Sequence, residues 1–246
     1  MPKVFPRKAN IYIISVWVFF TLGMVRETQV EAQGPATIAG RVLFRGEIPQ
    51  SGKLAVTKDS VVCGQVEHFD ERLVVGRNRG IRYAVISVIG VSVDQSLPGK
   101  ELEPVLDQVG CVFLPRMRIV PNRTSLRILN NDNILHNFHT YPKLNTPVNL
   151  AHPSFIEEIE ASFLEPEEVL IKCDVHPWMR AWFIVVDHPY HAITDLDGKF
   201  KITGIPPGTY QIRCWQEKLG EQSVEIEFAS RERVEIDFTF QSIVQP

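Results

Sequence analysis

Beyond residue 35 the chain consists of short apolar-rich runs, and in several of them apolar and polar residues alternate with a period of two. The alternation is clearest near the end, where "SVEIEF" (223–228) and "VEIDFTF" (234–240) place apolar residues on one face and acids or threonine on the other. Successive side chains of a strand point to opposite faces, so this pattern predicts half-buried β-strands. Only "SFIEEIEASF" (154–163) has weak helical character, and a loop or a strand fits it equally well.

The predicted strands are short, rich in β-branched and aromatic residues, and separated by turn signals at intervals of roughly eight to twelve residues, which is typical of β-sandwiches. The full set of expected strands is 37–44, 53–57, 82–91, 111–120, 125–131, 136–140, 167–173, 181–187, 199–203, 209–216, 223–228 and 234–240.

The N-terminal segment has the order of a secretory signal peptide. Basic residues in "MPKVFPRKAN" precede the apolar run "IYIISVWVFFTLGMV", and a polar stretch with the small residue Ala32 follows. We therefore expect residues 1–32 to be a signal peptide cleaved after Ala32, and the rest of the chain to be periplasmic or secreted. The alternative is an uncleaved anchor that attaches the protein to a membrane.

Composition adds one exclusion. The 246 residues carry a net charge of −3, and no cluster of basic residues stands out. Nucleic-acid binding usually requires a concentrated basic surface, so we expect no nucleic-acid partner.

Export changes how the four cysteines are interpreted, because disulfides persist in oxidising compartments. Cys63, Cys111, Cys173 and Cys214 allow three full pairings. If Cys173 is a metal ligand, it must stay reduced. The natural pair is then Cys63 with Cys111, and Cys214 remains as a buried, inert thiol. The alternative is a disulfide between Cys173 and Cys214.

The strongest chemical signal is "KCDVHPWMRAW" (172–182), which places Cys173, His176 and Met179 within seven residues. A thiolate, an imidazole and a thioether form a soft donor set that suits copper, and such sites use a second histidine. The upstream segment "NNDNILHNFHT" (130–140) offers His136 or His139.

Residues three apart on a strand point to opposite faces, so His136 and His139 are not expected to bind the same metal. The competing interpretation is a zinc site with the four ligands His136, His139, Cys173 and His176. That interpretation conflicts with the strand geometry and leaves Met179 without a role.

Together, "FLPRMRIVPNRTSLRILNNDNILHNFH" and "KCDVHPWMRAWFIVV" resemble the cupredoxins, the small blue-copper electron-transfer proteins. The ligand loop has the Cys-x-x-His-Pro-aromatic-Met spacing of the amicyanin type. The resemblance covers about residues 105–187 and implies a cupredoxin-like Greek-key β-sandwich, placed at 101–187. It also implies one-electron transfer through a type 1 site to a redox partner protein such as a cytochrome.

Carried over by position, the resemblance implies one mononuclear copper ion with the ligands His136, Cys173, His176 and Met179. Asn137 matches the residue that hydrogen-bonds to the cysteine loop. Asp174 departs from the pattern, since a hydroxyl residue is commoner there. A carboxylate at this position is expected to lower the reduction potential or to weaken the hydrogen bond of Asn137 to the cysteine loop.

The same resemblance implies that electrons pass through the edge of His176. The surrounding surface, with Pro177, Trp178 and Trp182, would dock the partner. Trp178 and Trp182 are also expected to pack against the core or shield the site. Four other histidines are expected to be surface or turn residues, namely His139, His152, His188 and His191.

A second resemblance lies in "AITDLDGKFKITGIPPGTYQIRCWQE" (192–217), with its Thr-Asp-x-x-Gly-x-Phe and Pro-Pro-Gly-x-Tyr motifs. It resembles the carboxypeptidase regulatory-like domain, which implies a smaller immunoglobulin- or transthyretin-like β-sandwich at 188–246. The strands within 33–100 fit either sandwich. Residues 36–95 would complete the C-terminal sandwich around an inserted copper domain, or add strands to the copper domain.

The expected protein is therefore all-β, exported and copper-binding. No nucleophile–base pair stands at a persuasive spacing, so we expect no enzymatic activity. The alternatives are a copper carrier or sensor that does not shuttle electrons, and a structural or carbohydrate-binding protein of the cell surface.

Overall fold

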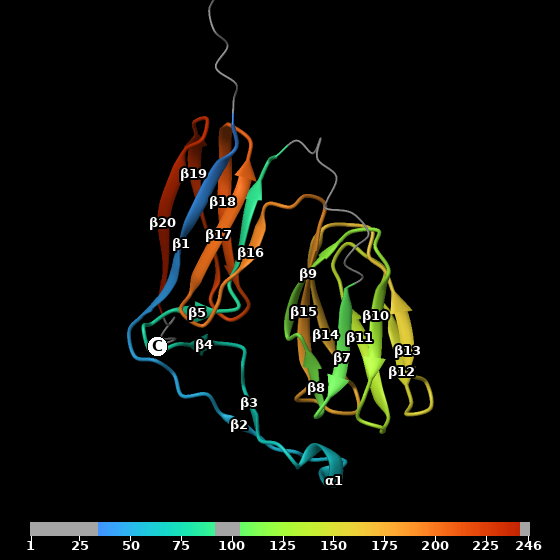
Figure 1. Ribbon diagram of the computed structural model, residues 1–246. Coiled ribbons are helices and arrows are strands. Elements are labelled where there is room, and N and C mark those ends of the chain that lie inside the picture. Colours follow the sequence, from blue (N-terminus) through green and yellow to red (C-terminus); the bar gives the residue numbers. More distant parts are fainter. Residues whose placement is uncertain (1–33, 92–103, 242–246) are drawn as a thin grey trace, which may run out of the picture. The chain divides into compact units, whose positions relative to one another are not determined.

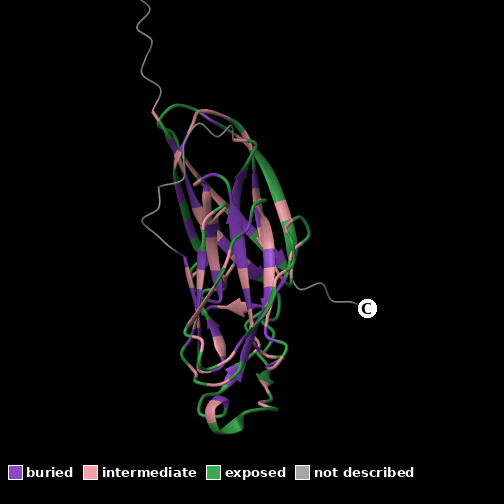
Figure 2. Cartoon of the chain, turned by 90° about the vertical axis from the view of Figure 1, so that its right-hand side faces the viewer, coloured by how far each residue is buried: buried purple, intermediate pink, exposed green. Residues whose placement is uncertain are grey.

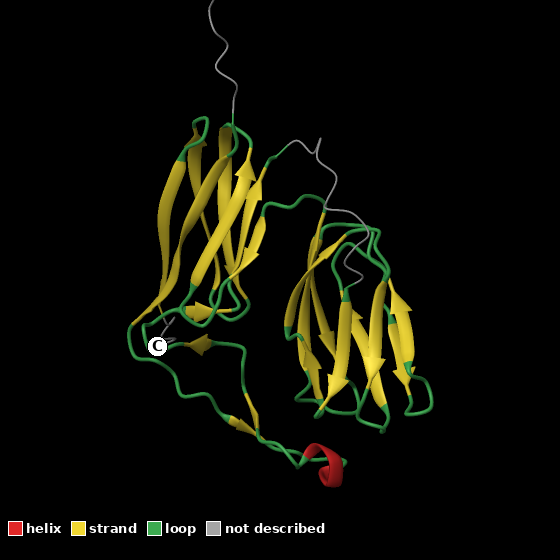
Figure 3. Cartoon of the chain, in the orientation of Figure 1, coloured by secondary structure: helices red, strands yellow, loops and turns green. Residues whose placement is uncertain are grey.

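The computed structural model describes residues 34–91 and 104–241. Within these ranges almost all regular structure is strand (Figure 3), and the only helix is the single turn α1 (Ser60–Cys63). The all-β prediction is confirmed. No helix in the described ranges has the length and apolar character needed to cross a membrane. The predicted signal peptide, residues 1–32, lies outside the described residues.

Seven strands form what we call the outer sandwich (Figure 1). One sheet has the order β17-β1-β20 and the other the order β16-β6-β18-β19. The strands are β1 (Ala36–Arg45), β6 (Val85–Ile89), β16 (His191–Ile193), β17 (Lys199–Ile205), β18 (Gly208–Gln216), β19 (Gly220–Phe228) and β20 (Arg233–Gln241).

Strand β1 is the central strand of its sheet, antiparallel to β17 and parallel to β20. A Cβ atom added at Gly40 would lie 1.7 Å from the carbonyl oxygen of Ile236, so the close approach of β1 to β20 requires glycine at this position. The first and last described strands of the chain are thereby joined.

Nine strands form what we call the inserted sandwich. Its sheets have the orders β13-β10-β7-β8 and β12-β11-β14-β15-β9. The strands are β7 (Val105–Val109), β8 (Val112–Leu114), β9 (Met117–Pro121), β10 (Leu126–Asn130), β11 (His136–Tyr141), β12 (Asn149–His152), β13 (Glu158–Ala161), β14 (Glu167–Lys172) and β15 (Arg180–Val186).

The sequence left open which sandwich the N-terminal strands belong to. In the structure β1 and β6 pair only with strands that follow residue 190. The sandwich at 105–186 is therefore inserted between β6 and β16 of the outer one.

Between β1 and β6 the chain forms short pairs rather than the expected strand at 53–57. Strand β2 (Lys53–Leu54) pairs with β3 (His68–Phe69), and β4 (Val74–Val75) pairs with β5 (Ile81–Arg82). We call residues 53–69, which include α1, the strap. A disulfide between Cys63 and Cys111 attaches the strap to the inserted sandwich.

The expected strand at 111–120 is divided in two. Strand β8 pairs with β7 in one sheet, whereas β9 pairs with β15 in the other. Pro115, which has no N–H to donate to a ladder, stands between them. The chain thus changes sheets at this proline.

Each sandwich has its own apolar core, and the buried residues lie along its strands (Figure 2). The outer core contains Phe228, Ile212 and Cys214, and the inserted core contains Phe183, Phe138 and Cys173. Cys173 and Cys214 are both free and belong to different cores. The alternative disulfide between them is therefore absent.

Contacts also join the two sandwiches. Glu217, whose side chain is 2% exposed, accepts a hydrogen bond from the indole N–H of Trp182 at 2.8 Å and pairs with Arg116. Trp182 is partly buried and packs against an apolar cluster that contains Met117 and Ile184, as expected, but its partners are at this junction and not at the cysteine loop.

Candidate metal centre

The candidate ligands come from neighbouring strands of one sheet. His136 begins β11, and Cys173 directly follows β14, the antiparallel neighbour of β11. His176 and Met179 lie on the loop that connects β14 to β15. The loop is tight, since the backbone N–H of Met179 donates to the carbonyl of His176 at 2.9 Å.

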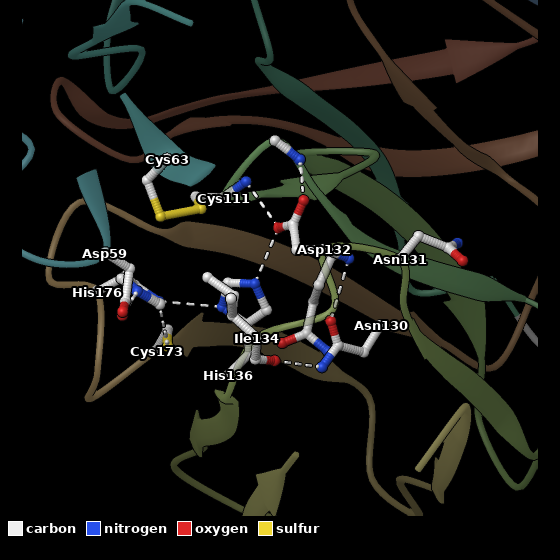
Figure 4. A network of polar contacts seen from close by, with 12 residues as sticks. Asp59, Cys63, Cys111, Asn130, Asn131, Asp132, Ile134, His136, Cys173 and His176 are labelled. Carbon is white, nitrogen blue, oxygen red and sulfur yellow. Dashed lines mark hydrogen bonds and ion pairs between the residues drawn. A yellow bond between two sulfur atoms is a disulfide. The ribbon is translucent and has the colours of Figure 1, made fainter. Parts of the chain in front are cut away.

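Three of these side chains converge in the interior (Figure 4). The Nδ1 atoms of His136 and His176 are 3.0 Å apart, and Sγ of Cys173 lies 3.7 Å from Nδ1 of His176. Both histidines are 0% exposed and Cys173 is 2% exposed. Met179, 1% exposed, packs in the same apolar cluster as Cys173.

Each imidazole is held from its far side by a carboxylate. Nε2 of His136 lies 2.8 Å from Oδ2 of Asp132, and Nε2 of His176 lies 2.9 Å from Oδ2 of Asp59. An ionised carboxylate only accepts hydrogen bonds, so each Nε2 carries the proton and donates it. In the neutral rings both Nδ1 atoms then present lone pairs.

When Cys173 is deprotonated and both rings are neutral, two imidazole lone pairs and a thiolate face one another, and such an arrangement suits a cation. Donor atoms bound to one ion at about 2.0 Å (nitrogen) and 2.3 Å (sulfur) stand roughly 3.3–3.7 Å apart. The spacing of 3.0 Å between the nitrogens and of 3.7 Å from nitrogen to sulfur is close to that range.

The two histidines differ in their electrostatics. Burial acts to lower the pKa of His176, and the hydrogen bond to Asp59 acts to raise it. Burial outweighs the hydrogen bond, so the pKa is lowered and the neutral ring is favoured. Burial also acts to lower the pKa of His136, but Asp132 and Cys173 outweigh it and the pKa is raised.

Asp132 links the site to the disulfide. Its Oδ2 accepts a hydrogen bond from the backbone N–H of Cys111 at 2.8 Å, and its Oδ1 accepts one from Gly110. Burial acts to raise the pKa of Asp132, but the hydrogen bonds from His136 and these two backbone groups outweigh it, so the pKa is lowered. Asp132 is therefore held as a carboxylate beside His136.

Asn137 connects the two segments that carry the ligands. Its side-chain oxygen accepts a hydrogen bond from the backbone N–H of Asp174 at 3.2 Å, next to Cys173. This is the bridge that the resemblance implied. Because the backbone of Asp174 makes the contact, the unusual carboxylate at that position does not interrupt it.

The side chain of Asp174 turns instead to His139, with both carboxylate oxygens 3.0 Å from its Nδ1. His139 is partly exposed and packs on Tyr141, with ring centroids 4.3 Å apart. It takes no part in the cluster of His136, Cys173 and His176. The four-ligand zinc interpretation therefore lacks one of its ligands.

Three expectations about histidines were wrong. His176 was expected to present an edge to the surface, but it is buried. His152 and His191, expected at surfaces or turns, lie in strands: His152 is buried at the end of β12, and His191 stands in β16 with its Nε2 buried. His188 does lie in the turn between β15 and β16, although its ring is buried. His152 fits the interior because its Nδ1 contacts the amide nitrogen of Gln108 at 2.8 Å and its Nε2 contacts the carbonyl of Ile156 at 2.9 Å.

Trp178 lies against the site as expected. Its ring centroid is 5.1 Å from that of His176, and its indole N–H donates to the carbonyl of Cys111 at 3.1 Å. The tryptophan therefore packs between the ligand loop and the disulfide.

Sequence reasoning missed the two carboxylates. Asp132 stands four residues before His136 in the polar turn "NNDN", a signal that could have been used. Asp59 is 117 residues away from His176, and nothing in its neighbourhood marks it.

No protein-family model matches the chain, and no curated protein matches it. Among solved structures, the chain is similar to the copper-containing nitrite reductase (NirK) of Thermus scotoductus SA-01, with 20% identity and a TM-score of 0.33. This match covers 40% of the chain and 25% of the reductase. The chain thus spans about a quarter of that protein.

Two smaller proteins are matched over almost their whole length. A purple cupredoxin from Nitrosopumilus maritimus has 17% identity and a TM-score of 0.29, with 34% of this chain and 99% of that one covered. An oxidized amicyanin variant has 14% identity and a TM-score of 0.32, with 41% of this chain and 98% of that one covered. The carboxypeptidase regulatory-like resemblance has no counterpart among these matches and stays a prediction.

Proposed function

We propose that the chain is an exported copper protein that transfers single electrons through a type 1 site. The ligands would be His136, Cys173 and His176, with Met179 as a weak axial donor. The observation that carries the proposal is the convergence of two carboxylate-held imidazoles and a free thiol in the interior of the inserted sandwich.

The donor set favours copper over zinc. Two imidazoles, one thiolate and a thioether correspond to the ligands of blue-copper sites, whereas His139, the fourth ligand that zinc would need, faces Asp174. When bound there, copper supplies a one-electron couple.

The protein itself holds the candidate ligands in fixed orientations and excludes water from them. Asp59 and Asp132 fix the orientation of both rings, and Asn137 ties the cysteine loop to β11. The apolar core around Cys173 keeps water away from the thiol. Ligands held in place on both sides of a redox change need little rearrangement, which favours fast electron transfer to a partner such as a cytochrome.

The decisive experiment is titration of the purified protein with copper(II), followed by visible absorption. We expect an intense thiolate-to-copper band with one equivalent bound, and its loss in Cys173→Ser. The matched control is Cys214→Ser, which should keep the band. No band in the wild-type protein, or an equal band in Cys173→Ser, would overturn the proposal.

A second candidate function is a copper carrier that does not shuttle electrons. It is favoured by the burial of His176, because neither ring of the pair reaches the surface. The two candidates differ in kinetics. Rapid electron exchange between the copper-loaded protein and a soluble cytochrome supports the shuttle, and slow exchange with tight copper retention supports the carrier.

A further inference from the structure

The candidate metal centre is closed by a segment that lies outside the inserted sandwich in sequence. Of the two carboxylates that hold the imidazoles, Asp132 belongs to the turn before β11 and its side chain is 5% exposed. Asp59 belongs to the strap, and its side chain is 40% exposed. Only His176 is therefore held by a group that reaches solvent.

Two contacts besides that of Asp59 fasten the strap to the inserted sandwich. The disulfide joins Cys63 to Cys111, and the ring of His68 packs on Trp178, with centroids 5.7 Å apart. Within the strap, Nε2 of His68 contacts the carbonyl of Cys63 at 2.9 Å and holds the ring in place. The two outer contacts place the strap against the loop that carries His176.

Apolar residues of the strap extend the same core. Val56 and Val62 are partly buried and pack with the cluster that contains Cys173 and Met179. The strap is therefore part of the wall of the site, and the complete burial of His176 depends on it.

We propose that the strap is a cover of the metal site and that Asp59 is the positioning residue that latches it onto His176. The metal-binding aspect of this inference rests on the proposed function. The hydrogen bond at Nε2 keeps Nδ1 of His176 turned toward His136, and the strap separates the ring from solvent and from any docking protein. Reagents reach Cys173 only when the strap lifts.

The cover is tested first without metal, on the full chain, by alkylation of Cys173 with iodoacetamide and peptide mapping. We expect Asp59→Ala to raise the modification rate of Cys173 at least tenfold. Cys214, buried in the outer core, is the internal reference and should be unchanged. The matched control is Glu67→Gln, which alters an exposed strap carboxylate paired with Lys53.

A second variant addresses the disulfide. Replacing both Cys63 and Cys111 by serine releases the other fastening, and it should also accelerate modification of Cys173. An unchanged rate in both Asp59→Ala and the double variant overturns the cover, provided that circular dichroism shows the wild-type fold.

The role of the hydrogen bond between Asp59 and His176 is tested in the copper-loaded protein. A carboxylate that accepts the far N–H of an imidazole makes the ring a stronger donor, which favours copper(II). We expect Asp59→Asn to raise the reduction potential by about 59 mV, which corresponds to a tenfold change in relative affinity for a one-electron couple. It should also speed copper loss to a chelator, and Asp59→Glu should restore part of both properties.

A potential and a release rate in Asp59→Asn equal to those of Glu67→Gln would refute the positioning role. Failure of the cover and failure of the proposed copper function give different results. If the protein binds no copper but Asp59→Ala exposes Cys173, the cover stands and the proposed function fails.

Discussion

The two sandwiches each bury one free cysteine, and the contrast between them shows what makes a site. Cys214 lies in the outer core among apolar residues, and burial raises the pKa of its thiol to about 12. Cys173 is equally buried but has His176 at 3.7 Å and His136 in the same cluster. Burial alone surrounds Cys214 with apolar neighbours, whereas the imidazoles beside Cys173 complete a donor set that suits a cation.

The largest expected change in stability comes from truncating a buried phenylalanine in either core. Phe183 packs against Phe138 and Phe163 in the inserted sandwich, and Phe228 packs against Tyr210 in the outer one. Removing a buried phenylalanine costs about 3–5 kcal/mol. Both Phe183→Ala and Phe228→Ala should lose about that much stability in urea unfolding.

Only Phe183→Ala should also weaken copper binding, as measured by titration, because its core supports the ligands. Equal weakening by Phe228→Ala would show that the two cores do not act separately.

Acid should weaken the outer sandwich through His191. Burial lowers the pKa of this ring from 6.5 to about 3, and its Nε2 is buried without a hydrogen-bond partner in the described structure. Above pH 6.5 the ring is neutral in both states and has no effect. As the pH falls from 6.5 toward 3, the unfolded chain takes up the proton first, and stability is lost.

The loss attributable to His191 should reach about 3 kcal/mol at pH 4. Urea unfolding of the wild type and of His191→Gln at pH 7 and pH 4 measures it as a difference. Parallel pH profiles for the two proteins would contradict the assignment.

Copper should stabilise the inserted sandwich, and this stabilisation should require Cys173 but not Cys214. Copper at a hundred times its dissociation constant should stabilise the folded state by about 2.7 kcal/mol, because a ligand that binds only that state shifts unfolding by mass action. Thermal unfolding with and without copper should show this gain in wild type and Cys214→Ser. The gain should be absent from Cys173→Ser.

The smallest expected effect concerns the second histidine of β11. His139→Ala should leave copper affinity within about twofold of wild type, since the ring faces Asp174 on the outside of the sheet. The paired variant His136→Ala should abolish tight binding. A clear loss of metal affinity in His139→Ala would instead support the four-ligand site in which His139 is a ligand.

Local patterns predicted the elements that carry the ligands. Strands β11, β14 and β15 match the expected strands at 136–140, 167–173 and 181–187, which are short runs bounded by turn signals. The three-residue spacing of His136 and His139 is enough to place them on opposite faces of a strand. These features depend on neighbours within a few residues, which a sequence displays directly.

Features that depend on distant partners were not predictable. Asp59 becomes important only because the strap is folded against His176 across 117 residues. The change of sheet at Pro115 depends on which strands lie nearby, and the alternation around 111–120 reads as one strand. The burial of His152 likewise requires Gln108 and Ile156 as partners.

The insertion of one sandwich into the other has a consequence for how the protein folds during synthesis. Strand β1 is made early, yet its parallel partner β20 follows it by 196 residues, as the pair Arg41 and Asp237 shows. Chains emerge from their N-terminus, and domains fold as units when they are complete. The inserted sandwich, with its strap, is complete in sequence once Val186 has been made, before any of β16 to β20 exists. We therefore expect the inserted sandwich to fold first during synthesis and the outer sandwich to close only when β20 has been made.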